Sequence, residues 1–217
     1  MTIPIAIFGG PGSGAVVAQS LRALATAQGG VRVLGFLNDV LPAGERVSDV
    51  PVIGPFASWA TLAEEVRFVA PLHQVKAMPA RAGIVAALGI PVHRWTTVID
   101  PMSAVAPDAT IGHGCFIGPF ASVGPGVRLG AHTVVRAGAH VGHDCRLGDF
   151  VFVGTNAVVC GFGTVHDGAY IAPGATIGDR CSIGRFAVVG LGSVVTDDVS
   201  DLQTVHGMPA RERSREQ

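Results

Sequence analysis

Aliphatic residues recur at every sixth position over almost half of the chain. The row holds 17 Val, Ile or Leu residues without an insertion. These residues, called anchors below, are Ile99, Val105, Ile111, Ile117, Val123, Leu129, Val135, Val141, Leu147, Val153, Val159, Val165, Ile171, Ile177, Ile183, Val189 and Val195. An α-helix repeats about every 3.6 residues and a strand about every 2, so neither explains a lasting period of six. Hexapeptide repeats are typical of a parallel β-helix, in which each hexad is one short strand and one turn.

Small residues accompany the anchors at two fixed positions. The residue after each anchor is mostly glycine, and the fourth residue after it is usually small, as at Ala121, Ala139 and Ala157. We expect three hexads to form one triangular coil, with successive coils stacked about 4.8 Å apart as parallel strands. Each anchor then points inward, the small residue fits the corner, and glycine serves the turn where φ is positive. Because one hexad cannot bury its apolar side alone, stability comes from stacking.

Residues 1–97 follow a different pattern, in which apolar strands alternate with helices. We predict strands at 3–8, 31–37, 51–54 and 66–70, a glycine-rich loop at 9–14, and helices at 15–28, near 56–65 and near 79–88. This alternation predicts a small Rossmann-like domain with a parallel sheet of four or five strands. The expected division of the chain is therefore 1–97 for this domain, 98–200 for the β-helix and 201–217 for a C-terminal tail.

The glycine-rich loop is a candidate ligand site. A glycine-rich loop ahead of a helix binds anions, because free N–H groups and the helix dipole face the ligand. Asp39, at the end of the second strand, is placed to bind a ribose hydroxyl. The glycines at 9, 10, 12 and 14 do not spell GxGxxG, so the alternative is that they serve only a tight turn. The short domain favours a phosphate-bearing ligand smaller than a dinucleotide, such as a nucleotide-sugar.

Composition narrows the function classes. The chain has 217 residues, of which 48% are hydrophobic and 30 are glycine, and this composition suits a Val/Gly/Ala solenoid. A net charge of −1 provides no basic face for nucleic acid. No apolar run is long enough to span a membrane, and no basic leader precedes the first strand. We therefore expect a soluble, cytoplasmic protein that binds neither nucleic acid nor membrane.

The cysteines and histidines offer few catalytic candidates. Three of the four cysteines stand at the small corner position, and none has CxxC or zinc-ligand spacing, so packing is their expected role. The histidines are expected mostly at surface turns. His143 differs because Asp144 follows it, and a neighbouring carboxylate can orient a histidine general base. The alternative is an exposed turn histidine beside an unrelated acid.

The chain resembles a known family, the hexapeptide-repeat sugar acetyltransferases of the PglD/NeuD type, which modify nucleotide-linked amino sugars. The resemblance covers nearly the whole chain. It rests on the segments Gly35-Phe-Leu-Asn-Asp39, Pro51-Val-Ile-Gly54, His143-Asp-Cys-Arg-Leu-Gly-Asp149, Ser193-Val-Val-Thr-Asp-Asp-Val199 and Gly207-Met-Pro-Ala-Arg211. It implies a left-handed β-helix, a homotrimer, and acetyl-CoA in the groove between neighbouring β-helices, with no metal cofactor.

The resemblance also implies roles for individual residues. His143 takes the proton from the attacking amine of a UDP-4-amino sugar, Asp144 orients its ring, and N–H groups near Gly161 hold the thioester oxygen. The residues implied for the acceptor are Gly9, Gly10, Gly12, Ser13, Asn38, Asp39 and Arg136. The residues implied for acetyl-CoA are Phe152, Gly161, Ala172, Gly190 and Pro209.

The chain departs from the family pattern at several places. Arg136 stands where the family usually has Asn, and this arginine is placed to pair with an anionic group of the acceptor. Phe152 replaces a histidine that contacts the thioester region of CoA. Ser13 replaces the histidine of a Gly-His-Gly loop, and Pro71-Leu-His-Gln74 lacks the usual Gly-Asp-Asn.

Three functions stay open from the sequence. The first is an acetyltransferase for an amino or hydroxyl group of a nucleotide-linked sugar in surface-glycan synthesis. The second is an acyltransferase with another acyl donor or acceptor, and the third is a sugar-nucleotide binder that has lost the chemistry. A zinc enzyme on the same fold would need three gathered histidines, and His113, His140, His143 and His166 lack that spacing.

Overall fold

The N-terminal part is a small α/β domain built on one five-stranded sheet. The computed structural model describes residues 2–75 and 77–212. The elements of this domain are β1 (Ile3–Phe8), α1 (Ser13–Gln28), β2 (Val31–Leu37), β3 (Arg46–Val47), β4 (Val50–Gly54), η1 (Phe56–Thr61), β5 (Arg67–Val69), α2 (Met78–Ala87) and η2 (Val92–Arg94). The strand order is β3-β4-β2-β1-β5, and β1, β2, β4 and β5 run parallel. The predicted small parallel sheet is therefore confirmed.

Two local predictions for this domain were wrong. The helix expected near 56–65 is a single 3-10 segment, η1, which ends at Thr61 and starts directly after Pro55. The short strand β3 was not expected, and it pairs antiparallel with β4 through Val47 and Val50. Both elements are too short to leave a periodic signal in the sequence.

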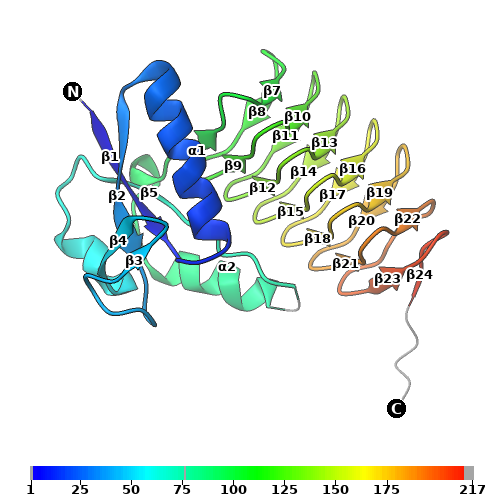
Figure 1. Cartoon of the computed structure of the whole chain (residues 1–217). Coiled ribbons are helices and arrows are strands. Elements are labelled where there is room, and N and C mark those ends of the chain that lie inside the picture. The colour runs from blue at the N-terminus through cyan, green and yellow to red at the C-terminus, as the bar shows by residue number, and fades with distance from the viewer. Residues whose placement is uncertain (1, 76, 213–217) are drawn as a thin grey trace.

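Residues 98–212 form a left-handed β-helix, which extends away from the N-terminal domain (Figure 1), and its strands are two residues long apart from one of three residues near the end. Its first strands are β6 (Val98–Ile99), β7 (Ala104–Val105), β8 (Thr110–Ile111), β9 (Phe116–Ile117), β10 (Ser122–Val123), β11 (Arg128–Leu129), β12 (Val134–Val135), β13 (His140–Val141) and β14 (Arg146–Leu147). The strands that follow are β15 (Phe152–Val153), β16 (Val158–Val159), β17 (Thr164–Val165), β18 (Tyr170–Ile171), β19 (Thr176–Ile177), β20 (Ser182–Ile183), β21 (Val188–Val189), β22 (Val194–Val195), β23 (Thr204–His206) and β24 (Arg211–Glu212).

These strands form three flat sheets around one core. We call β6, β9, β12, β15, β18, β21, β23 and β24 the junction sheet, β7, β10, β13, β16, β19 and β22 the second sheet, and β8, β11, β14, β17 and β20 the third sheet. From β6 to β22 the paired strand residues are 18 positions apart, as Ser122 pairs with His140, whereas β21 pairs with β23 at a spacing of 16. The first corner joins the junction sheet to the second sheet, the second corner joins the second to the third, and the third corner leads back.

The predicted core is confirmed. From Ile117 to Val195 every anchor is buried, and most of the residues four places later, such as Ala121 and Ala139, share the same cluster. Cys145 and Cys181 are among them, and Cys115, at the same repeat position, is also buried. Burial raises the pKa of the Cys115 thiol to about 12, so this thiol is a packing group. β23 pairs with β21 and thus continues the junction sheet past residue 200, while the expected domain boundaries stay predictions.

The glycines after the anchors have a different role from the one expected. Positive φ falls three residues after the anchor, where Gly126 and Gly138 stand but also Phe120 and Asp144. The glycine directly after the anchor is needed because the next coil lies against it. A Cβ on Gly124 would lie 3.0 Å from the backbone nitrogen of His143. Close stacking of successive coils, and not turn conformation, therefore selects glycine at this position.

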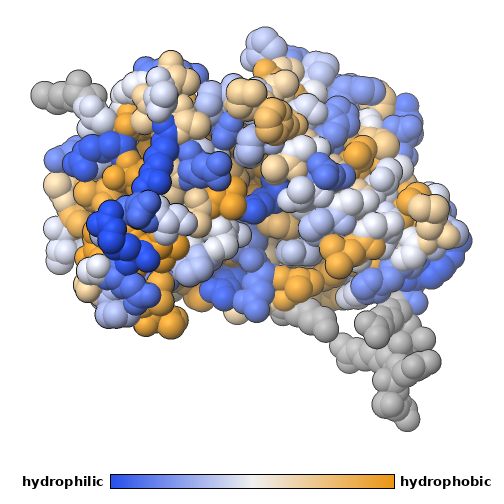
Figure 2. Space-filling view, viewed as in Figure 1, coloured by the Kyte–Doolittle hydropathy of each residue, from blue (hydrophilic) through white to orange (hydrophobic). Residues whose placement is uncertain are grey.

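The N-terminal domain packs on the outer face of the junction sheet. Ile5 and Ile7 of β1 and Val17 of α1 share one buried cluster with Phe116 and Val134. Figure 1 shows α1 lying between the N-terminal sheet and the first coils. The N-terminal domain and the β-helix therefore share one apolar interface. On the molecular face drawn in Figure 2, exposed hydrophobic side chains lie in small groups separated by polar ones.

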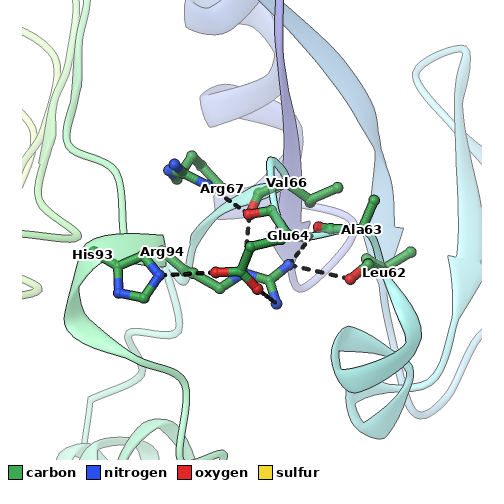
Figure 3. Close-up of polar contacts among 7 residues, drawn as sticks. All are labelled: Leu62, Ala63, Glu64, Val66, Arg67, His93 and Arg94. Carbon is green, nitrogen blue, oxygen red and sulfur yellow. Dashed lines mark hydrogen bonds and ion pairs between the residues drawn. The ribbon is translucent and has the colours of Figure 1, made fainter.

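A buried arginine holds the segment that leads into the β-helix. The Arg94 side chain donates hydrogen bonds to the carbonyl oxygens of Val66, at 3.2 Å, and Ala63, at 2.8 Å. Its guanidinium also lies over the ring of Phe68, at 4.8 Å from the centroid. Figure 3 shows the arginine between these carbonyl groups and the carboxylate of Glu64. Because Arg94 is 4% exposed, these contacts fix η2 against the domain just before β6 begins.

Candidate functional site

His143 and Asp144 form a polar pair on the second corner. They stand in the turn between β13 and β14, where Asp144 has a left-handed φ of 58°. Asp tolerates this conformation better than most residues. The Nδ1 atom of His143 lies 3.0 Å from Oδ2 of Asp144. Both side chains are about half exposed, so the pair is open to a ligand.

The neighbouring coil supports the backbone of His143 and one side of its ring. The N–H of Phe162 donates to the carbonyl oxygen of His143, and the two rings meet edge to face at 4.9 Å. The guanidinium of Arg180, one coil further, lies 4.4 Å from the centre of the Phe162 ring. The N–H of Asp144 donates to Pro125 on the preceding coil. The histidine is thus held by three stacked coils.

Gly161 lies directly beside the free side of the His143 ring. A Cβ at Gly161 would lie 2.7 Å from Nε2 of His143, so any larger residue would displace the ring. Within residues 2–75 and 77–212, the N–H of Gly161 donates no hydrogen bond. The second corner therefore brings together a histidine nitrogen and an uncommitted backbone donor, and the roles of His143 and Gly161 in a reaction stay predictions.

The other residues predicted for acetyl-CoA lie on the junction sheet and its first corner. Ala172 and Gly190 occupy the same corner column as Arg136, and Pro209 is an exposed residue between β23 and β24. Phe152 is buried at the domain junction, where it stacks on Tyr170 at 4.5 Å. The structure thus does not bring these four residues to His143 within one chain, because the whole second sheet separates the two corners.

The glycine-rich loop joins β1 to α1 and turns with positive φ at Gly9 and Gly12. The side-chain amide of Asn38 donates to the carbonyl oxygen of Gly9 at 3.0 Å. Its oxygen accepts from the N–H groups of Val40 and Leu41. Asn38 therefore shapes the loop around Gly9. Gly10 lies against it, because a Cβ there would be 2.8 Å from the amide nitrogen of Asn38.

Asp39 and Ser13 differ in their local roles. Asp39 accepts a hydrogen bond from the N–H of Phe56 at 2.7 Å, so one of its oxygens holds the start of η1. Ser13 is the first residue of α1, whose first turn has no acidic side chain. The N-terminus of this helix therefore suits an anion. The assignment of Asp39 to a ribose hydroxyl stays a prediction.

Two histidines expected at the surface lie instead at the junction between the domain and the β-helix, where His132 is buried and His73 is half-buried with both ring nitrogens enclosed. His73, in the segment after β5, packs on Phe152 with ring centres 5.5 Å apart. His132, on the third corner, stacks on Phe150 at 4.9 Å and meets Trp95 edge to face at 4.7 Å. Burial lowers the pKa of each imidazole to about 4, so both are neutral near pH 7.

Arg136 completes this buried group. It follows the anchor Val135 on the first corner, in a column whose other members are Asp100, Gly118, Gly154, Ala172 and Gly190. Burial lowers the pKa of its guanidinium, and the phenol of Tyr170 acts in the opposite direction. Of His73, His132 and Arg136, only Arg136 was marked in the sequence, because a large residue there departs from the small residues that usually follow an anchor. The sequence around His73 gave no such signal.

The remaining histidines form no shared site. His140 pairs with Ser122 at 2.6 Å, and His166 lies 3.4 Å from the hydroxyl of Ser182. Among the described residues, no group of three or more His, Cys, Asp or Glu side chains is arranged to hold a metal ion. In the same part of the chain, no helix combines the length and the apolar composition needed to cross a bilayer.

Comparison with known proteins places this geometry in context. Residues 108–143 match the family described as bacterial transferase hexapeptide (six repeats). No curated protein matches the chain. Among solved structures, the acetyltransferase domain of PglB from Neisseria gonorrhoeae FA1090, in complex with acetyl coenzyme A, is 29% identical. The match covers 98% of this chain and 100% of that chain, with a TM-score of 0.86.

Two further structures span the same length. A mutant of perosamine N-acetyltransferase from Caulobacter crescentus, in complex with CoA and GDP-perosamine, is 26% identical. It covers 97% of both chains with a TM-score of 0.85. WeeI from Acinetobacter baumannii AYE is 24% identical, covers 98% of this chain and 100% of its own, and has a TM-score of 0.83. This last match supports the fold alone.

Proposed function

The chain belongs to the hexapeptide-repeat sugar acetyltransferases of the PglD/NeuD type, and on that premise we propose that it acetylates the amino group of a nucleotide-linked sugar with acetyl-CoA. The observation that carries this proposal is the His143–Asp144 pair beside Gly161. The two relatives named above with CoA ligands support the acyl donor, and the one with GDP-perosamine supports an amino-sugar acceptor. We expect a UDP-4-amino sugar used in surface-glycan synthesis, with the enzyme in the cytoplasm.

The pair explains how the amine is activated. When Nδ1–H of His143 donates to Asp144 across 3.0 Å, Nε2 is left with its lone pair free. This nitrogen takes a proton from the amine as the amine attacks the thioester carbonyl. The new C–N bond forms while the C–S bond breaks, and the proton passes from Nε2 to the departing thiolate. The carboxylate of Asp144 stabilises the imidazolium between these two transfers.

Gly161 supplies the second element of the mechanism. Its uncommitted N–H lies on the coil next to His143, where it can donate to the thioester oxygen as negative charge develops. The missing side chain leaves room for the acyl group beside Nε2. Both properties fit a thioester carbonyl placed against the second corner. No acyl-cysteine is required, in keeping with the raised pKa of the buried Cys145.

The acceptor end is assigned to the glycine-rich loop, Asn38, Asp39 and Arg136. Arg136 stands on the first corner and the others belong to the N-terminal domain, whereas His143 stands in the turn between β13 and β14, on the second corner. One chain therefore holds the acceptor residues and His143 apart. We propose a homotrimer in which the first corner of one subunit, with Ala172, Gly190 and Pro209, faces the second corner of the next. Acetyl-CoA would occupy the groove between them.

The experiment is a thiol-release assay with acetyl-CoA and a panel of UDP- and GDP-linked amino sugars. The His143→Ala variant tests the base, and His140→Ala is the matched control, because His140 is an exposed histidine three residues away on the same coil. Turnover that requires His143 but not His140 supports the proposal. A wild-type protein that binds acetyl-CoA but acetylates no amino sugar in the panel would point to another acceptor class. Turnover unchanged in His143→Ala removes that residue from the mechanism.

A further inference from the structure

Buried nitrogen atoms without partners gather at one place in the molecule. In residues 2–75 and 77–212, four buried side-chain atoms have no hydrogen-bond partner: both ring nitrogens of His73, Nδ1 of His132 and Nη1 of Arg136. His132 and Arg136 flank strand β12, and the His73 ring, from the distant segment after β5, lies near both of them and near the backbone of Pro71. Buried polar groups in proteins are almost always paired. Such a concentration at one junction therefore calls for a specific partner.

The charge at this junction is uncompensated. In the described part of the chain, no carboxylate lies within ion-pair distance of Arg136. The charged and titratable groups near it are His73, which is neutral near pH 7, and the phenol of Tyr170. A partly buried guanidinium without a counter-ion is costly to the fold. Arginine at this position is therefore explained by an anion that arrives with a ligand.

The surroundings of Arg136 suit part of the acceptor. Phe152 and Tyr170 stack with their rings 10° from parallel and form an aromatic floor, on which His73 also packs. Leu72, the residue before His73, lies against Gly9: a Cβ added to Gly9 would be 3.6 Å from Cδ2 of Leu72. The segment at 71–73 thus runs from the glycine-rich loop to Arg136. A ligand that begins on the loop can continue to the guanidinium.

We propose that Arg136 and His73 form an oxyanion subsite that binds an anionic group of the acceptor, either a carboxylate on the sugar or the diphosphate. This deepens the proposed function, since it assigns the acceptor a negative charge at a defined position. The Arg136 guanidinium donates paired hydrogen bonds to the two oxygens, and neutral His73 donates one N–H. His73 is a positioning residue, and Arg136 determines specificity.

The test is a binding measurement that needs no acetyl transfer. Titration calorimetry compares inorganic pyrophosphate, UDP-glucose and UDP-glucuronate on the wild type, Arg136→Met and Arg136→Lys. The two UDP-sugars differ only at C6, where glucuronate carries a carboxylate. If the anion is the sugar carboxylate, wild type prefers UDP-glucuronate over UDP-glucose, and Arg136→Met abolishes that preference. If it is the diphosphate, Arg136→Met weakens both UDP-sugars and pyrophosphate by about 10- to 100-fold, the value of a charge-assisted hydrogen bond.

A stability measurement separates a binding role from a structural one. Because Arg136→Met removes an uncompensated charge and keeps the volume, we expect the ligand-free variant to gain about 2–4 °C in Tm. Arg136→Lys should keep part of the anion affinity, since it retains the charge without the paired donors. Equal binding by wild type and Arg136→Met, or no saturable binding of any of the three anions to wild type, overturns the subsite. Neither result depends on whether the protein transfers acetyl groups.

Discussion

Gly161 lies so close to His143 that a single methyl group would disturb the histidine. A Cβ at position 161 would be 2.7 Å from Nε2, well inside van der Waals contact. The atom it meets is the far end of a side chain that can rotate, so the fold can accommodate the change while the imidazole cannot keep its position. The requirement for glycine at this position is thus tied to the geometry of the proposed base.

We therefore expect Gly161→Ala to lower kcat by about 10- to 100-fold, because a shift of about 1 Å at a reacting group has effects of this size. Its melting temperature should stay close to that of the wild type. Steady-state kinetics and thermal melts measure the two effects. Gly83→Ala is the control, since a Cβ at Gly83 in α2 meets no atom within 4 Å. Full activity in Gly161→Ala would show that the position of the His143 ring does not matter.

The His143–Asp144 pair makes a graded prediction. His143→Ala should lower kcat by about 10²- to 10⁴-fold, the range for loss of a general base. Asp144→Asn should lower it less, because the ring keeps its place while the imidazolium loses the carboxylate that stabilises it. Both variants should bind CoA as the wild type does, measured by calorimetry. An Asp144→Asn protein with wild-type kcat would separate this carboxylate from the reaction.

The inward row of anchors is tested at Leu147. Leu147→Lys places an unpaired charge in the core of the β-helix, which costs more than the fold can supply. We expect no folded, soluble protein, judged by circular dichroism and by yield in the soluble fraction. Arg146→Lys is the matched control, because this neighbour on β14 is exposed and points away from the core. A Leu147→Lys protein that melts like the wild type contradicts the burial of this row.

The junction histidines predict a loss of stability in acid. The pKa of His132 falls from about 6.5 in the unfolded chain to about 4 in the fold, where burial is the main cause and the neighbouring His113 adds to it. The unfolded state thus binds more protons between these values, so stability is complete above about pH 6.5 and falls as the pH drops towards 4. The shift corresponds to about 3 kcal/mol. His73 acts in the same direction.

His132→Phe should remove the share of this acid sensitivity that belongs to His132. Phenylalanine is suited to the position, since Phe120, Phe150, Phe162 and Phe186 already stand at equivalent turns with positive φ. Urea unfolding at pH 7, 5.5 and 4.5 measures the effect, and the variant should lose less stability than the wild type between the first and last values. An identical pH dependence in both proteins would assign the acid response to other groups.

Arg94 is expected to matter more for the fold than its ion pair suggests. Arg94→Met leaves the carbonyl oxygens of Val66 and Ala63 without their donor, which should lower the free energy of unfolding by at least about 2 kcal/mol. Glu64→Gln should change it very little, because that carboxylate is exposed and the ion pair is screened. Chemical denaturation compares the two. Equal losses would give the ion pair the larger role.

The sequence predicted the β-helix well because every coil has the same packing requirements, an inward aliphatic anchor and a small corner residue. The anchors and the small corner residues act through neighbours at constant spacing, so a pattern read along the chain is also a pattern in space. The same regularity made His143 recognisable, since it precedes Asp144 at a corner. The role of the glycines after the anchors was misread, because the sequence shows where a side chain is missing and not what approaches it.

The junction could not be predicted in the same way. His73 lies in a segment without periodicity, and its contact with Phe152 depends on how the N-terminal domain rests on the junction sheet. His132 occupies a turn position that is exposed at Phe120 and Phe162, and only the covering domain buries it. Contacts of this kind arise from tertiary packing between unrelated segments. The sequence pointed only to Arg136, through the rule that it breaks.

The pairing of residues 18 positions apart from β6 to β22 has a consequence for how such a chain can change in length. Inserting or deleting six residues keeps every later anchor inward, so the core survives. The same event moves all later residues by one side of the triangle, and Gly161 would then no longer lie beneath His143 if the change fell between them. Only changes by whole coils preserve both. The fold thus tolerates length changes in steps of six residues, whereas the contact between His143 and Gly161 on the second corner tolerates, between these two residues, only steps of a whole coil.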